Sequence, residues 1–208
     1  MPGKTHLICQ SGSRPVFTSS RRRQAYLDIL DTCAAAYRVK VLAWSVLSKE
    51  AYLVVIPPSA EALGAFMRVV RTRYTRYLHA GGYRDEISPR RFASCPVDTA
   101  AAVDSIHYVE SLPVAQRLAD KAGKYLFSSA SARLNGGCSL LSTDATLTSR
   151  MRDWTKRLAR PLEEERVSYL LMRLRTGKPA GETPFVRSVE RKVGMNLSRH
   201  RGRPRTKK

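Results

Sequence analysis

The chain has 208 residues, of which 43% are hydrophobic, a share that suits one folded domain with an appendage and argues against wholesale disorder. Its 37 Lys and Arg residues against 17 Asp and Glu give a formal net charge of +20, which favours a polyanionic partner, most commonly nucleic acid. A basic but otherwise inert surface is the alternative. The sequence has no strongly amphipathic, Lys-rich terminal helix, which argues against a role at a membrane surface.

The four cysteines are widely spaced and form no CxxC pair, so we expect neither a zinc site nor a disulfide framework. The N-terminal stretch MPGKTHLICQ has no long apolar run, so we also expect no signal peptide and no membrane span. A reduced, cytoplasmic protein is therefore the expectation.

Short β-rich runs alternate with amphipathic stretches in the first half of the chain. The expected strands lie within residues 5–12, 39–47, 50–58 and 86–95. The expected helices lie at residues 19–39, 59–82 and 98–112. Ser48-Lys49 predicts a hairpin between two of the strands, Pro89 weakens the case for the last strand, and Pro113 is expected to disturb the third helix.

The order β-α-β-β-α-β-α predicts an α+β fold whose first six elements form a ferredoxin-like βαββαβ unit. Such a unit has a four-stranded antiparallel sheet with two helices on one face. After about residue 128 the composition becomes small and polar, and then helical again. We therefore expect four parts: a ferredoxin-like domain, a connector, a helical DNA-binding annex and a disordered basic tail. Their ranges are 1–128, 129–146, 147–198 and 199–208.

Two polar side chains open the strand within SKEAYLVVIPP, which otherwise looks like a buried core strand. Side chains two positions apart in a strand point to the same face. We therefore expect Glu50 and Tyr52 to stand together at the start of this strand.

Basic residues gather in the second helix and in the tail. The helix carries Arg68, Arg71, Arg73 and Arg76. The tail RHRGRPRTKK includes Arg201, Arg203, Arg205, Lys207 and Lys208. Tyr74 and Tyr77 interleave with the helical arginines, as in grooves where bases stack, although the spacing of Tyr74 favours core packing. An extended Arg-Pro tail suits a narrow minor groove, and generic contact with phosphates is the alternative.

Five stretches together resemble the REP-associated tyrosine transposases, a branch of the single-tyrosine HUH transposases. The stretches are KTHLICQSGSRPVF, VKVLAWSVLSKEAYLVVIPP, FMRVVRTRYTRYLH, IHYVESLPVAQRLA and TGKPAGETPFVRSVERKVGMNLSRHRGRPRTKK. They are similar to the family's opening strand, its hairpin, its second helix, the helix that carries the nucleophile, and its C-terminal region with a GRPR-type tail. The resemblance rests on their order and spacing along most of the chain.

The resemblance implies cleavage and rejoining of single-stranded DNA at hairpin-forming repeats, through a phosphotyrosine intermediate and with the help of Mg²⁺ or Mn²⁺. It places Tyr108 at the nucleophile's position. The family's two metal-binding histidines on the third strand are replaced here by Glu50 and Tyr52, and its polar residue four positions after the tyrosine is Leu112. Phe127 stands where the family has a tryptophan.

A leucine cannot bind a hard cation and a neutral phenol binds one poorly, so Glu50 is left as an oxygen donor, with His6 as a second candidate ligand if the first strand brings it alongside. We therefore expect a DNA-binding protein with lost or impaired cleavage. The alternatives are an active transposase or nickase that uses Tyr108 with a rebuilt metal site, and a basic RNA-binding protein. The expected partner is single-stranded or hairpin repeat DNA in the nucleoid, with no membrane and no small-molecule substrate. A homodimer is left open.

Overall fold

The computed structural model describes residues 3–12, 14–84 and 92–194. The four strands within these ranges are β1 (Thr5–Ser11), β2 (Lys40–Val46), β3 (Glu50–Ile56) and β4 (Ala93–Val97). They form one antiparallel sheet in the order β2-β3-β1-β4. This topology confirms the predicted ferredoxin-like α+β fold. The expected tail lies outside the described residues, as does most of the stretch in which the fourth strand was expected.

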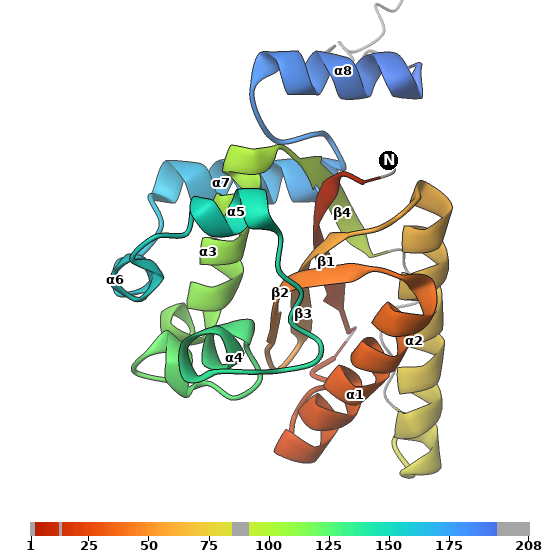
Figure 1. The fold of residues 1–208 in the computed structure, drawn as a ribbon. Helices are drawn as coiled ribbons and strands as arrows, with labels where there is room; N and C mark the ends of the chain where they lie inside the picture. The colour runs from red at the N-terminus through yellow and green to blue at the C-terminus, as the bar shows by residue number, and fades with distance from the viewer. Residues whose placement is uncertain (1–2, 13, 85–91, 195–208) are drawn as a thin grey trace, which may run out of the picture.

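Two long helices, α1 (Ser20–Tyr37) and α2 (Ala60–Ala80), pack side by side on one face of the sheet (Figure 1). Each begins at a serine cap, because Ser19 and Ser59 accept hydrogen bonds from backbone N–H groups of the first turn. Between these helices and the sheet, Tyr26 and Tyr74 meet edge to face with ring centroids 5.3 Å apart. Tyr74 is fully buried, which confirms the core-packing interpretation.

Helix α3 (Thr99–Ala115) covers the opposite face of the sheet (Figure 1). Most of its side chains are buried, because the C-terminal part of the chain packs against its other side. The helix runs past Pro113 and ends at Ala115, three residues later than expected. The proline lies in the last turn of the helix. Its missing N–H donor and the bulk of its ring therefore affect only the end of the helix.

The remaining described chain forms a short 3₁₀ turn and five helices. They are η1 (Ala122–Lys124), α4 (Ser129–Asn135), α5 (Ala145–Ser149), α6 (Trp154–Leu158), α7 (Glu164–Thr176) and α8 (Thr183–Val193). Helix α4 occupies part of the stretch expected as a connector, and it begins at a Ser128 cap. Leu147, Trp154 and Leu170 share one hydrophobic core with α3 and the sheet. No helix in the described ranges is long and apolar enough to cross a membrane.

A buried carboxylate, Glu110 of α3, ties three helices together. Its Oε1 accepts hydrogen bonds from Ser129 Oγ at 2.6 Å and Arg133 Nε at 3.0 Å, and its Oε2 accepts one from Trp154 Nε1 at 2.7 Å. Glu110 itself is fully buried. A buried charge is tolerated only when it is paired and fully hydrogen-bonded, so this network fixes α4 and α6 against α3.

The segment that follows α7 runs alongside the edge strand β4. Ala180 N donates to Pro96 O at 2.9 Å and Asp98 N donates to Ala180 O at 3.0 Å, so the segment adds a short parallel bridge to the sheet. The Asp98 carboxylate accepts from Ala101 N, which caps α3, and from Glu182 N. Gly181 has φ +146° and lies so close to Asp98 that a Cβ would collide with that side chain. Only glycine suits this position.

Candidate functional site

Tyr108 lies in the middle of α3 and faces the start of β3. Its ring meets that of Tyr52 edge to face, with centroids 5.7 Å apart and an interplanar angle of 87°. Tyr52 Oη in turn donates a hydrogen bond to Glu50 Oε2 at 3.0 Å. The expectation that Glu50 and Tyr52 share one face of the strand is therefore confirmed, and this is the face that α3 covers.

Strand β1 contributes Cys9 to the same cluster, since Cys9 pairs with Tyr52 in the sheet register. Burial raises the pKa of the Cys9 thiol to about 12, and the neighbouring Glu50 charge adds to the shift. The thiol is therefore protonated at neutral pH and unsuited to bind a metal or attack a substrate.

Both tyrosines of the cluster are held as neutral phenols. Burial raises the pKa of the Tyr108 hydroxyl, and the opposing influence of a hydrogen bond with Tyr52 is smaller. Burial also raises the pKa of Tyr52 far above its ordinary value. A phenol is a weak nucleophile until it loses its proton, so this environment disfavours attack by Tyr108.

The residues of this cluster do not fit a divalent cation. Mg²⁺ requires an octahedral shell of oxygen ligands. Among the described residues Glu50 supplies the only carboxylate of this cluster, and its Oε2 already accepts a hydrogen bond from Tyr52. Leu112, one helical turn after Tyr108, adds only apolar surface beside it. In the described ranges, no group of three or more His, Cys, Asp or Glu side chains is placed to hold a metal ion.

The first strand does not bring His6 alongside Glu50. His6 pairs with Val55, whereas the partner of Glu50 is Ser11, five positions along β1 and therefore about 17 Å away. The even spacing to Ile8 also turns His6 toward the α1–α2 face of the sheet. His6 is only 6% exposed, neither ring nitrogen has a hydrogen-bond partner in the described chain, and burial lowers its pKa to about 4.

The four arginines of α2 do not all lie at one place on the surface. Arg68 and Arg71 line the same pocket of about 430 Å³, together with Gln10 of β1 and Phe92. Arg73 lies toward α1, where it counteracts the burial that raises the pKa of Cys33. Arg76 is exposed near the end of the helix. The predicted tail residues Arg201, Arg203, Arg205, Lys207 and Lys208 lie outside the described residues.

A second pocket, of about 360 Å³, lies directly beside Tyr108. Its walls are mostly apolar and come from the last turns of α3, from Leu158 at the end of α6 and from the chain between α6 and α7, including Pro161 and Leu162. Sequence reasoning missed this pocket, because nothing in residues 158–162 shows that they fold back onto α3. The buried Trp154–Glu110 hydrogen bond places them there.

Comparison with solved structures finds a REP-associated tyrosine transposase bound to a REP hairpin. The two chains superpose with a TM-score of 0.56 at 15% sequence identity, over 69% of this chain and 88% of that one. No protein-family model matches the sequence, and no curated protein matches it either. At this level of identity the likeness establishes the fold alone.

Proposed function

We propose that this protein binds single-stranded or hairpin repeat DNA, as a protein of the REP-associated tyrosine transposase type whose strand cleavage is lost or impaired. The shared fold supports the first half of the proposal, because the similar structure is of a transposase bound to a REP hairpin. The net charge of +20 supports it independently, since a field of that sign attracts a polyphosphate backbone.

The pocket between α2 and the β1–β4 edge supplies a surface suited to DNA. Arg68 and Arg71 offer positive charge for phosphates, and Phe92 offers an aromatic ring on which a base can stack. Gln10 forms a buried part of the pocket wall, and its Oε1 accepts a hydrogen bond from Tyr26 Oη at 2.7 Å. The five basic tail residues are proposed to add contacts with the phosphate backbone.

The observation that carries the second half of the proposal is the hydrogen bond between Tyr52 and Glu50. It occupies the place where the resemblance puts two metal-binding histidines, while the apolar Leu112 replaces the third ligand. A metal contributes several kcal/mol to a transition state of this kind, and each 1.4 kcal/mol changes the rate about tenfold. The raised pKa of Tyr108 also disfavours cleavage, because it keeps the hydroxyl protonated.

Binding competition tests the proposed partner. A fluorescent hairpin DNA with unpaired flanks is bound by the full chain and then displaced by unlabelled hairpin DNA, duplex DNA or a structured RNA of equal length. We expect the hairpin DNA to compete best. Preferential displacement by the RNA would overturn the DNA assignment and favour an RNA-binding protein.

A further inference from the structure

A pocket of about 330 Å³ lies between helix α1, strand β2 and the segment at residues 126–140. Leu27 and Leu140 give it apolar walls, and two carboxylates, Asp28 and Asp31, stand one helical turn apart on its α1 side. We call it the acidic pocket. Its volume lies near the lower end of the range of about 300–1,000 Å³ that is typical of ligand pockets, so it suits a small group.

The charge of the acidic pocket is opposite to that of the whole chain. The chain has a formal net charge of +20, yet no described Lys or Arg lines this pocket. Asp28 Oδ1 accepts a hydrogen bond from Gln24 Nε2 at 2.8 Å, and Asp31 Oδ2 accepts one from Ser139 Oγ at 2.7 Å. Neither carboxylate forms an ion pair with a described residue. Two oriented negative charges therefore remain available to a cation.

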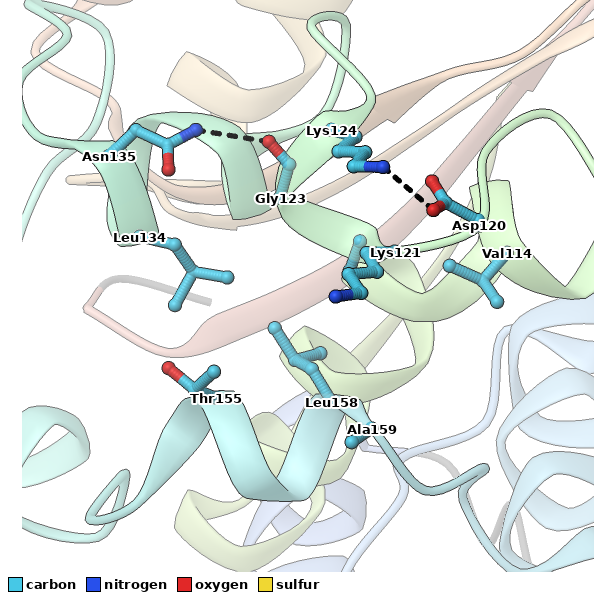
Figure 2. A pocket seen from close by; sticks show the side chains of 11 residues that line it. Val114, Asp120, Lys121, Gly123, Lys124, Leu134, Asn135, Thr155, Leu158 and Ala159 are labelled. Carbon is cyan, nitrogen blue, oxygen red and sulfur yellow. Dashed lines mark hydrogen bonds and ion pairs between the residues drawn. The ribbon is translucent and has the colours of Figure 1, made fainter.

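The adjoining cavity shows how local this negative charge is. A cavity of about 590 Å³ lies between the end of α3, η1, α4 and α6, and Asn135 lines both it and the acidic pocket. Figure 2 shows Lys121 and Lys124 on its wall, where Lys124 Nζ lies 2.7 Å from Asp120 Oδ2. A cationic group that approaches this side of the protein is therefore favoured in the acidic pocket and disfavoured beside Lys121.

Two further side chains of the acidic pocket lack a partner. Leu126 is 74% exposed, so its contact with another apolar group would be favourable. Trp44 is only 2% exposed, and its Nε1 has no hydrogen-bond partner in the described chain. A buried N–H donor without an acceptor costs free energy, which a ligand with an acceptor can recover. Because this nitrogen is covered, its contact with a ligand requires a small movement of the side chains around it.

We propose that the acidic pocket docks a basic segment of a partner protein. A Lys or Arg side chain of the segment pairs with Asp28 and Asp31. A backbone carbonyl of the segment accepts from Trp44 Nε1, and an adjacent apolar side chain packs on Leu126. DNA is a poor occupant, because its phosphates are repelled by the two carboxylates. The pocket shares no lining residue with the arginine pocket of α2, so docking and DNA binding are separate properties.

Fluorescence anisotropy of labelled peptides added to the full chain tests the proposal. The probe is a Gly-Ser peptide with a central Arg-Leu pair. In one control peptide citrulline replaces the arginine, which removes the charge and keeps the shape. In another, serine replaces the leucine. We expect the Arg-Leu peptide to bind about fivefold more tightly than either control, as suits exposed ion pairs and one apolar contact.

Variants of the chain assign the binding to the acidic pocket. Asp28→Asn combined with Asp31→Asn should weaken binding of the Arg-Leu peptide about fivefold and remove its advantage over the citrulline peptide. Leu126→Ser should remove only the advantage over the serine peptide. Glu164→Gln combined with Glu165→Gln is the matched control, because it removes two charges from the exposed first turn of α7 and should change nothing. Equal binding of the arginine and citrulline peptides, or unchanged binding in the aspartate variant, would overturn the proposal.

The indole N–H resonances in an NMR titration report on the contact with Trp44. The chain has two tryptophans, and the other, Trp154, already donates to Glu110. The Arg-Leu peptide should therefore shift the resonance of Trp44 and leave that of Trp154 in place. A peptide that binds without shifting the Trp44 resonance would contradict the proposed hydrogen bond.

Two other occupants are distinguished by further arms of the experiment. Putrescine that displaces the Arg-Leu peptide with equal affinity would show a site for free amines in place of a protein segment. Self-association of the full chain that is lost both on deletion of residues 199–208 and in the aspartate variant would assign the pocket to the tail of a second copy. We expect neither result, and each would overturn the assignment to a different protein.

Discussion

Tyr52 Oη donates a hydrogen bond to Glu50 Oε2 at 3.0 Å, and the Tyr52 ring meets that of Tyr108 edge to face. The carboxylate and the phenol therefore satisfy each other at the start of β3. This relationship accounts for two polar groups at the end of a core strand without a metal ion. It also leaves Tyr108 beside a neutral phenol, a group that neither removes the nucleophile's proton nor polarises a phosphate.

Replacing Glu110 should strongly destabilise the fold. Glu110→Gln removes the charge that pairs with Arg133 and weakens the hydrogen bonds from Ser129 and Trp154. We expect a loss of about 3 kcal/mol in the free energy of unfolding, because a buried pair is broken with one partner left behind. Urea denaturation measures it. Glu164→Gln, on the exposed first turn of α7, is the control and should change stability by less than about 0.5 kcal/mol.

His6 should make the protein acid-sensitive. Its pKa is about 4 in the folded state against 6.5 in the unfolded state, so the unfolded chain binds the proton more readily. Stability is therefore complete above pH 6.5 and falls by about 3 kcal/mol as the pH drops from 6.5 to 4. Chemical denaturation at several pH values measures the difference between wild type and His6→Leu. Equal pH dependence of the two proteins would contradict the prediction.

The arginine pocket should contribute to DNA affinity through charge. Arg68→Ala combined with Arg71→Ala should weaken hairpin binding and reduce the slope of log K against log salt by about 1.5, since each lost phosphate contact is worth about 0.7–0.9. Arg76→Ala is the comparison, because Arg76 lies on the same helix but outside the pocket. An undiminished slope in the double variant would show that the pocket does not contact phosphates.

The basic tail should also contribute to DNA affinity through charge. Deletion of residues 199–208 is expected to weaken DNA binding and to flatten its salt dependence, because six Lys or Arg side chains are lost. The measurement is a salt titration of the dissociation constant for the full and shortened chains. A salt slope that stays the same after the deletion would contradict a phosphate-contacting role.

Local patterns in the sequence were sufficient to predict the sheet and its first helices. Helices α1 and α2 lie where helical spacing of apolar residues predicts them, and period-two alternation placed Glu50 and Tyr52 on one face. The position of His6 depended on the register of β1 against β3, which no local pattern reveals.

Long-range packing accounts for the features that were missed. The Glu110 network joins α3 to Ser129 and Trp154, which follow it by 19 and 44 positions, and only the folded chain shows that this acidic side chain is buried. The cavity at Lys121 and the pocket at Tyr108 arise from the same packing, because α6 supplies Leu158 to both. Helix α4 was missed because its composition is small and polar.

The central claim, DNA binding without effective cleavage, is tested most directly by trapping a covalent adduct. Labelled single-stranded hairpin DNA with its flanks is incubated with the protein and Mg²⁺ or Mn²⁺, and denaturing electrophoresis separates free from protein-linked DNA. We expect a stable complex in native gels and no adduct in denaturing gels. The triple variant Glu50→His, Tyr52→His and Leu112→Asn should then acquire an adduct that requires Tyr108. An adduct with the wild-type chain that disappears in Tyr108→Phe would contradict the account.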